Sequence, residues 1–153
     1  MTRRWCHDIA MQIGAAGPGS IIVTFPTYRP DLVVELADAL ALPFVDFRAV
    51  YLAPLGFAAH TLPLTVIEAA IADRADTRGL VLHNAEALLA AKPAADRQAW
   101  LAAFLDMPRS ATVLLPLALF GPDLGDHPRL IRLAEAAVPP ESLLMQLASL
   151  RVT

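Results

Sequence analysis

The sequence predicts a three-layer α/β domain with a mainly parallel sheet. Short apolar segments rich in Ile, Val and Leu alternate along its 153 residues with longer segments whose apolar side chains recur at helical spacing. The short segments are apolar throughout rather than at every second position, which is typical of strands buried on both faces of a sheet. Polar or proline-rich residues follow each short segment. In parallel sheets such residues gather at the carboxyl edge, where ligands bind.

The first three elements precede residue 48. Residues 20–25 are β-branched and apolar, and we expect a buried first strand there. Pro30 suits the first position of a helix, whose apolar stripe begins with Leu32. Residues 43–47 form the second strand.

The middle of the chain supplies a loop, two helices and a strand. The loop is interrupted by proline and glycine and leads to a helix at residues 63–74. The third strand begins at Gly79 and runs into the polar residues from His83 to Glu86. Residues 94–106 form an amphipathic helix.

The last third of the chain begins with a fourth strand at residues 112–115. After a Gly-Pro-Asp turn, we expect a helix at residues 128–137, which the Pro139-Pro140 pair ends. A last helix would carry Leu143, Leu144, Leu147 and Leu150. No internal repeat is visible.

Composition indicates a single domain with a partner. Residues 1–19 end in a Gly/Pro-rich run, so we expect a flexible segment there and one domain at residues 20–153. Apolar residues make up 56% of the chain, more than one small core normally absorbs, which favours a protein partner or a homo-oligomer. The net charge of −3 and the scattered arginines argue that any DNA contact is indirect. The single cysteine, Cys6, fits a cytoplasmic protein. Pro, Gly and charged residues break the longest apolar stretch, so no membrane span is expected.

The polar end of the third strand holds the candidate catalytic residue. Glu86 could act as a general base, Asn84 could contact a nucleotide or anion, and His83 could be a ligand or a pH-sensitive group. In the alternative interpretation, Asn84 and Glu86 cap the helix that follows, and His83 lies satisfied at the strand end. The four histidines are dispersed, so we expect no metal site.

Two segments could hold a phosphate. Residues 25–31 follow the first strand, contain two prolines and no glycine, and offer Arg29 as an anion-binding candidate. The run from Gly14 to Ser20 imitates a Gly-rich phosphate loop, with Ser20 where the lysine belongs. The only lysine, Lys92, lies beyond the third strand. Neither segment predicts tight ATP binding, and no cofactor is expected.

Three further residues are candidates for contact with a partner. Arg129 and Arg132 are spaced by one helical turn and could form an arginine finger, or alternatively a solvated basic face. Trp5 could anchor an interface or belong to the core.

Three segments resemble the AAA+ type of P-loop NTPase, over roughly residues 20–150. Residues 80–88 are similar to a Walker B strand, with His83 in place of the metal-binding Asp. Residues 112–115 are similar to the sensor-1 strand, and residues 127–130 to the helix start that follows it. The lysine of Walker A is missing. Small relatives of this type include initiator-like and clamp-loader-like subunits and the small P-loop component of BREX phage-defence systems.

The resemblance implies a P-loop NTPase-like core with degenerate Walker motifs, working inside a multi-protein, DNA-associated assembly for DNA maintenance or phage defence. We therefore expect a structural or regulatory subunit rather than an enzyme. One alternative is a weak ATPase that uses the Gly14–Ser20 loop and Glu86. The other alternative is a DNA-binding module that uses the scattered arginines.

Overall fold

Five strands form one sheet in the order β2-β3-β4-β1-β5 in the computed structural model, which describes residues 2–141. The strands are β1 (Gly19–Thr24), β2 (Phe44–Asp46), β3 (Gly79–His83), β4 (Thr112–Leu117) and β5 (Leu130–Arg132). Every neighbouring pair is parallel. The expected parallel α/β sheet is therefore confirmed, and its first four strands lie where the apolar segments predict them.

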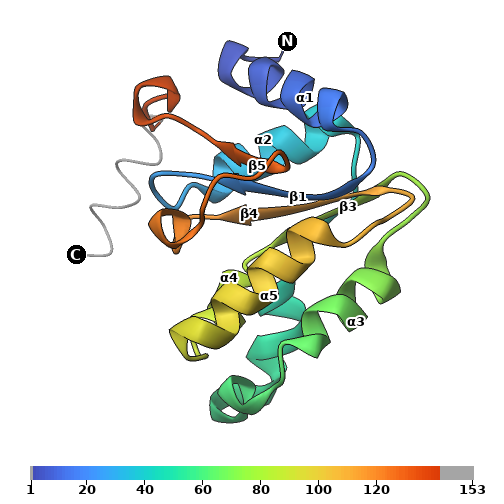
Figure 1. Cartoon of the computed structure of the whole chain (residues 1–153), viewed down its shortest axis with the longest axis vertical. Helices are drawn as coiled ribbons and strands as arrows, with labels where there is room; N and C mark the ends of the chain where they lie inside the picture. The colour runs from blue at the N-terminus through green and yellow to red at the C-terminus, as the bar shows by residue number, and fades with distance from the viewer. Residues whose placement is uncertain (1, 142–153) are drawn as a thin grey trace.

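Helices cover both faces of this sheet, as Figure 1 shows. The α-helices are α1 (Arg4–Ala16), α2 (Pro30–Leu40), α3 (Thr65–Arg74), α4 (Glu86–Leu89) and α5 (Ala94–Asp106). Shorter helical turns are η1 (Arg48–Leu52), η2 (Ala53–Thr61), η3 (Gly121–Asp123) and η4 (Glu135–Ala137). Helices α1 and α2 pack on one face, whereas α3, α4 and α5 pack on the other. The expected loop between β2 and α3 is thus made of η1 and η2.

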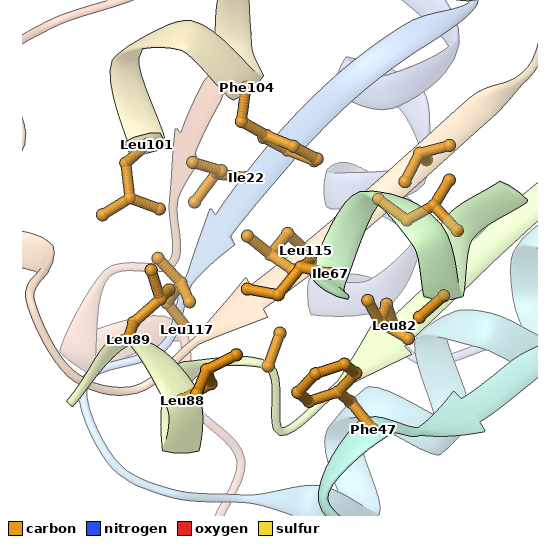
Figure 2. Packing of buried hydrophobic residues seen from close by; sticks show 14 of the residues in the cluster. Ile22, Phe47, Ile67, Leu82, Leu88, Leu89, Leu101, Phe104, Leu115 and Leu117 are labelled. Atoms are coloured by element: carbon orange, nitrogen blue, oxygen red, sulfur yellow. The ribbon is translucent and has the colours of Figure 1, made fainter. Parts of the chain in front are cut away.

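The pleat of the strands divides the apolar residues between two cores. In β1, Ile22 packs under α5, while Ile21 and Val23 point to the opposite face, against α1 and α2. Leu114 of β4 belongs to the second core, and its neighbour Leu115 to the first. Figure 2 shows the first core, where side chains from β1, β3, β4 and the helices meet. Because both faces are covered, the strands are apolar at every position.

The helix expected at residues 128–137 is wrong, because β5 occupies part of it. Residues 130–132 pair in parallel with the free edge of β1, and η4 follows them. Ile131 is buried in the second core, while Arg132 points to the exterior. Three residues are too few to show a hydrophobic periodicity. Their conformation is determined by pairing with the neighbouring edge of β1.

The flexible segment expected at residues 1–19 is instead largely helical. Helix α1 spans residues 4–16 and buries Trp5, Cys6, Ile9 and Ile13 against the second core. These residues recur at helical spacing, and the Gly/Pro-rich run forms only the short connection to β1. The expected helix through Leu143 lies outside the described residues. Within residues 2–141, no helix has both the length and the apolar character that crossing a membrane requires.

Candidate functional site

The carboxyl ends of β1, β3 and β4 meet at one edge of the sheet, between helices that leave toward opposite faces. Helix α2 follows β1 on one face, and α4 follows β3 on the other. Such a switch in direction opens a crevice in parallel sheets. A groove of about 570 Å³ lies there, and its walls include Tyr28, Asn84 and Glu86. The sequence therefore predicts the position of this edge correctly.

Glu86 lies at this edge with its carboxylate held by the chain after β4. Its Oε2 accepts hydrogen bonds from the backbone N–H groups of Ala118 at 3.0 Å and Leu119 at 2.8 Å, and Oε1 lies 3.2 Å from the Ala118 nitrogen. The side chain is buried, and this burial raises its pKa, although the two backbone donors lower it in part. No side chain caps the start of α4, so the expected capping by Glu86 and Asn84 is wrong.

His83, the last residue of β3, is enclosed by two aromatic rings. It stacks on Tyr28 at 5.7 Å between ring centroids and lies 5.5 Å from the ring of Phe44. Its Nε2 is 3.3 Å from the Tyr28 hydroxyl. Burial lowers the pKa of His83, while the nearby carboxylate of Asp46 acts in the opposite direction. A neutral ring between aromatic neighbours is a packing arrangement.

Asn84 joins three segments of the edge. Its amide donates to Oδ1 of Asp46 at 3.1 Å, and its carbonyl oxygen accepts from the Tyr28 hydroxyl at 3.0 Å. The residue has a positive φ of 65°, a conformation that asparagine tolerates better than most residues. Asn84 therefore fixes the loop after β1 to the ends of β2 and β3, and its side-chain oxygen and nitrogen are both engaged.

Arg29 lies in the loop after β1, but its charge is already paired. Nε and Nη2 donate to the two carboxylate oxygens of Asp31 at 3.0 and 2.9 Å, and Nη1 donates to the carbonyl of Pro139 at 2.7 Å. The hydrogen bond from Arg29 lowers the pKa of Asp31, and the same pair raises the pKa of Arg29. This guanidinium holds the chain near Pro139 against α2, so its donors are not directed at a phosphate.

Ser20 lies at the opposite, amino edge of the sheet. It is the second residue of β1, fully buried, and accepts a hydrogen bond from Arg109 at 2.6 Å. Arg109 also pairs with Glu68 at 2.8 Å. Part of the supposed phosphate loop, including Gly14, belongs to α1. The structure does not bring the Gly14–Ser20 segment and Glu86 together.

The two arginines expected on a helix lie on or beside β5. Arg129 donates to the carbonyls of Ala16, Gly17 and Ser20 at 2.7, 2.6 and 2.7 Å, so it closes the carboxyl end of α1 onto β1. Arg132 is exposed and donates to two carbonyls of the segment after β4. Both interpretations of this pair assumed a helix. That assumption is wrong, because Arg129 precedes β5 and Arg132 is its last residue.

Trp5 belongs to the second core, where its ring meets Phe25 edge to face at 6.4 Å. It is only 6% exposed and so cannot anchor a partner on the surface. Its neighbour Cys6 is also buried, and burial raises the pKa of this thiol to about 11. Trp5 and Cys6 therefore belong to the core of the domain.

One surface was not predicted from the sequence. Beyond β2, η1 and η2 expose Val50, Leu55 and Phe57, the last of them 98% exposed. A second hollow of about 450 Å³ lies beside Phe57 and Ala91. The sequence shows that this segment is apolar and interrupted by proline and glycine. It has no hydrophobic periodicity, however, so it does not predict which of its side chains are exposed.

The edge does not fit a magnesium nucleotide. Glu86 has its oxygens engaged by backbone donors, Arg29 is neutralised by Asp31, and the loop after β1 lacks N–H groups at its prolines. Among residues 2–141, no three His, Cys, Asp or Glu side chains are grouped to hold a metal ion. Comparisons with protein-family models, curated proteins and solved structures found no match to this chain.

Proposed function

We propose that this protein is a catalytically degenerate P-loop-like subunit that acts by binding a protein partner within a DNA-associated assembly in the cytoplasm, for DNA maintenance or phage defence. The observation that carries this proposal is the state of Glu86. Its carboxylate, the acidic group of the Walker B-like segment, is buried and accepts hydrogen bonds from two backbone N–H groups.

The arrangement of the strands supports a P-loop-like origin. The two strands that carry the resemblance, β3 and β4, are neighbours, and β4 also pairs with β1. A shared nucleotide edge requires these three strands to end side by side. The order of the strands is therefore compatible with a nucleotide site at this edge. The polar groups that such a site would need, Glu86 and Arg29, instead form contacts within the chain.

The exposed apolar side chains support binding to a protein. Exposed large apolar side chains lie on η1 and η2, at Val50, Leu55 and Phe57, and beside the groove, at Leu119. Large exposed apolar patches on soluble domains mark interaction sites more often than chance. This distribution is consistent with the partner that the apolar composition predicts.

Calorimetric titration of the full chain with ATP and Mg²⁺ tests the absence of nucleotide chemistry. We expect no saturable heat and no phosphate release above the blank, with Glu86→Gln identical to the wild type in both assays. Saturable binding, or turnover that Glu86→Gln abolishes, would establish the alternative of a weak ATPase and remove the proposal.

Sedimentation of the protein in native extract tests the assembly. The protein should migrate in particles much larger than its 16.4 kDa chain. DNase treatment should make these particles smaller or release the protein from them. Migration as a free monomer in both conditions would contradict membership of a DNA-associated assembly.

A further inference from the structure

We propose that the groove along the carboxyl edge binds an apolar protein segment that presents a carboxylate to Arg48. This assignment rests on the proposed function as a partner-binding subunit and adds to it the surface and the chemistry of the partner.

The two hollows described above adjoin one another. The hollow of about 570 Å³ and the hollow of about 450 Å³ share Arg48 and Ala87 in their walls. The first extends to Tyr28 and Leu119, and the second to Phe57. We call this surface the edge groove. An apolar helix or extended segment lies in grooves of this kind through a few large anchors.

Large apolar side chains stand exposed at both ends of the edge groove. Tyr28 is 53% exposed, Leu119 51% and Phe57 98%. Phe57 owes its position to Gly56, whose φ of 56° and ψ of −129° break η2 and direct the next residue outward. A conformation that L-residues rarely adopt thus places an aromatic ring in solvent, where only a partner could bury it.

Charge identifies the partner more closely. Arg48 is exposed and forms no ion pair within residues 2–141. The carboxylate that shares the groove, Glu86, is buried and engaged by backbone donors. Within the described residues, Arg48 is therefore the exposed charged side chain in the walls of the groove, and it complements an acidic side chain of a partner.

The same charge disfavours two other occupants. In a two-fold contact between copies of this chain, each Arg48 would approach the groove of the other copy and meet the Arg48 there. Nucleic acid would need several cations along its phosphates, whereas in the part of the chain that the structure describes Arg48 is the one Lys or Arg that lines this groove, and the walls are otherwise mainly apolar. An apolar segment with Asp or Glu satisfies both features of the surface.

Selection from an unbiased library of displayed random peptides tests the assignment on the immobilised full chain. Counter-selection uses a variant with both Arg48→Glu and Phe57→Ser. Enriched peptides should contain two or more large apolar residues together with Asp or Glu. No enrichment, or enriched peptides without an acidic residue, would overturn the proposal.

Affinities of one enriched peptide then localise the contact. Arg48→Glu and Phe57→Ser should each weaken binding about tenfold, as expected for central interface residues. Two matched variants on α1, Arg4→Glu and Met11→Ser, replace side chains of the same type that are exposed outside the groove, and should change the affinity less than about twofold. A peptide with its acidic residue changed to Arg should regain affinity for Arg48→Glu. Equal loss in the α1 variants would overturn the assignment.

The remaining outcomes are distinct from failure of the proposed function. Concentration-dependent dimers that Phe57→Ser abolishes would assign the groove to a second copy. DNA binding that Arg48→Glu abolishes would assign it to nucleic acid. Either result would refute the assignment of the groove to an acidic, apolar protein segment. The ATP titration tests the proposed function separately.

Discussion

The carboxylate of Glu86 accepts a hydrogen bond from the backbone N–H of Leu119 at 2.8 Å, in a place where the side chain is only 7% exposed. The bond joins the start of α4 to the chain that leaves β4, across the carboxyl edge of the sheet. Because Leu119 also borders the edge groove, this contact shapes the surface that we assign to a partner.

Removing this contact should destabilise the fold. Glu86→Ala leaves two N–H groups, those of Ala118 and Leu119, without their acceptor, which costs about 1–3 kcal/mol in the free energy of unfolding. Glu86→Gln keeps one side-chain oxygen and should lose less. Urea denaturation measures both, with the exposed Glu135→Ala as a control that should stay within about 0.5 kcal/mol. Equal stability of Glu86→Ala and the control would contradict the contact.

The pH dependence of stability should reveal the burial of Glu86. Burial raises its folded pKa above the ordinary value of 4.5, so the folded state holds this proton more tightly than the unfolded state. The stability that this raised pKa contributes is therefore fully present below pH 4.5 and is lost as the pH rises through the folded pKa. The difference in unfolding free energy between the wild type and Glu86→Gln should become more favourable to the wild type as pH falls. A flat difference would show that the pKa is not raised.

Asp31 should show the opposite dependence. Its pairing with Arg29 holds its folded pKa below the ordinary value of 3.8. The stability that it contributes is present above 3.8 and is lost as pH falls through the folded pKa. The advantage of the wild type over Asp31→Asn should therefore shrink in acid. An advantage that grows in acid would contradict the ion pair, and both series can be measured by the same urea titrations.

Arg129 should matter more to stability than Arg132, although the sequence offers them as a pair. Arg129 is half-buried and bonds three carbonyls between α1 and β1, so Arg129→Ala should cost about 2–4 kcal/mol. Arg132 is exposed, and Arg132→Ala should cost about 1 kcal/mol or less. Thermal unfolding of the two variants gives the comparison. Similar losses of stability in the two variants would contradict the difference in burial and hydrogen bonding between Arg129 and Arg132.

The sequence predicts the long elements well, because their patterns are set by burial. Residues 94–106 form α5 as expected, and the apolar run from Gly79 forms β3 between two covered faces. It fails for β5, a three-residue strand that forms because the edge of β1 is free to pair. It also misses α1, which is as long as α5 and has apolar residues at helical spacing, because the Gly/Pro-rich run that follows indicated a flexible segment.

The candidate site was located but its contacts were not predicted. The sequence places Asn84 and Glu86 at the carboxyl edge, yet their partners Tyr28 and Leu119 come from segments more than 30 residues away. Capping is a local pattern that a sequence can indicate, whereas these hydrogen bonds depend on which loops the sheet brings together. The exposure of Phe57 had no periodic signal either, because it follows from the single break at Gly56.

Gly79 should tolerate no side chain, whereas Gly14 should accept one. A Cβ at Gly79 would lie 1.8 Å from the backbone oxygen of Thr112, and the residue has a φ of 138° that L-residues rarely adopt. Gly79→Ala must therefore separate β3 from β4 at their first pair, and we expect a loss above about 3 kcal/mol or failure to fold. Nothing lies near the corresponding position of Gly14 in α1, where Gly14→Ala should stabilise the protein by about 0.5–1 kcal/mol. Circular dichroism melts of both variants measure the contrast, and a soluble Gly79→Ala with wild-type stability would refute the register of β3 against β4.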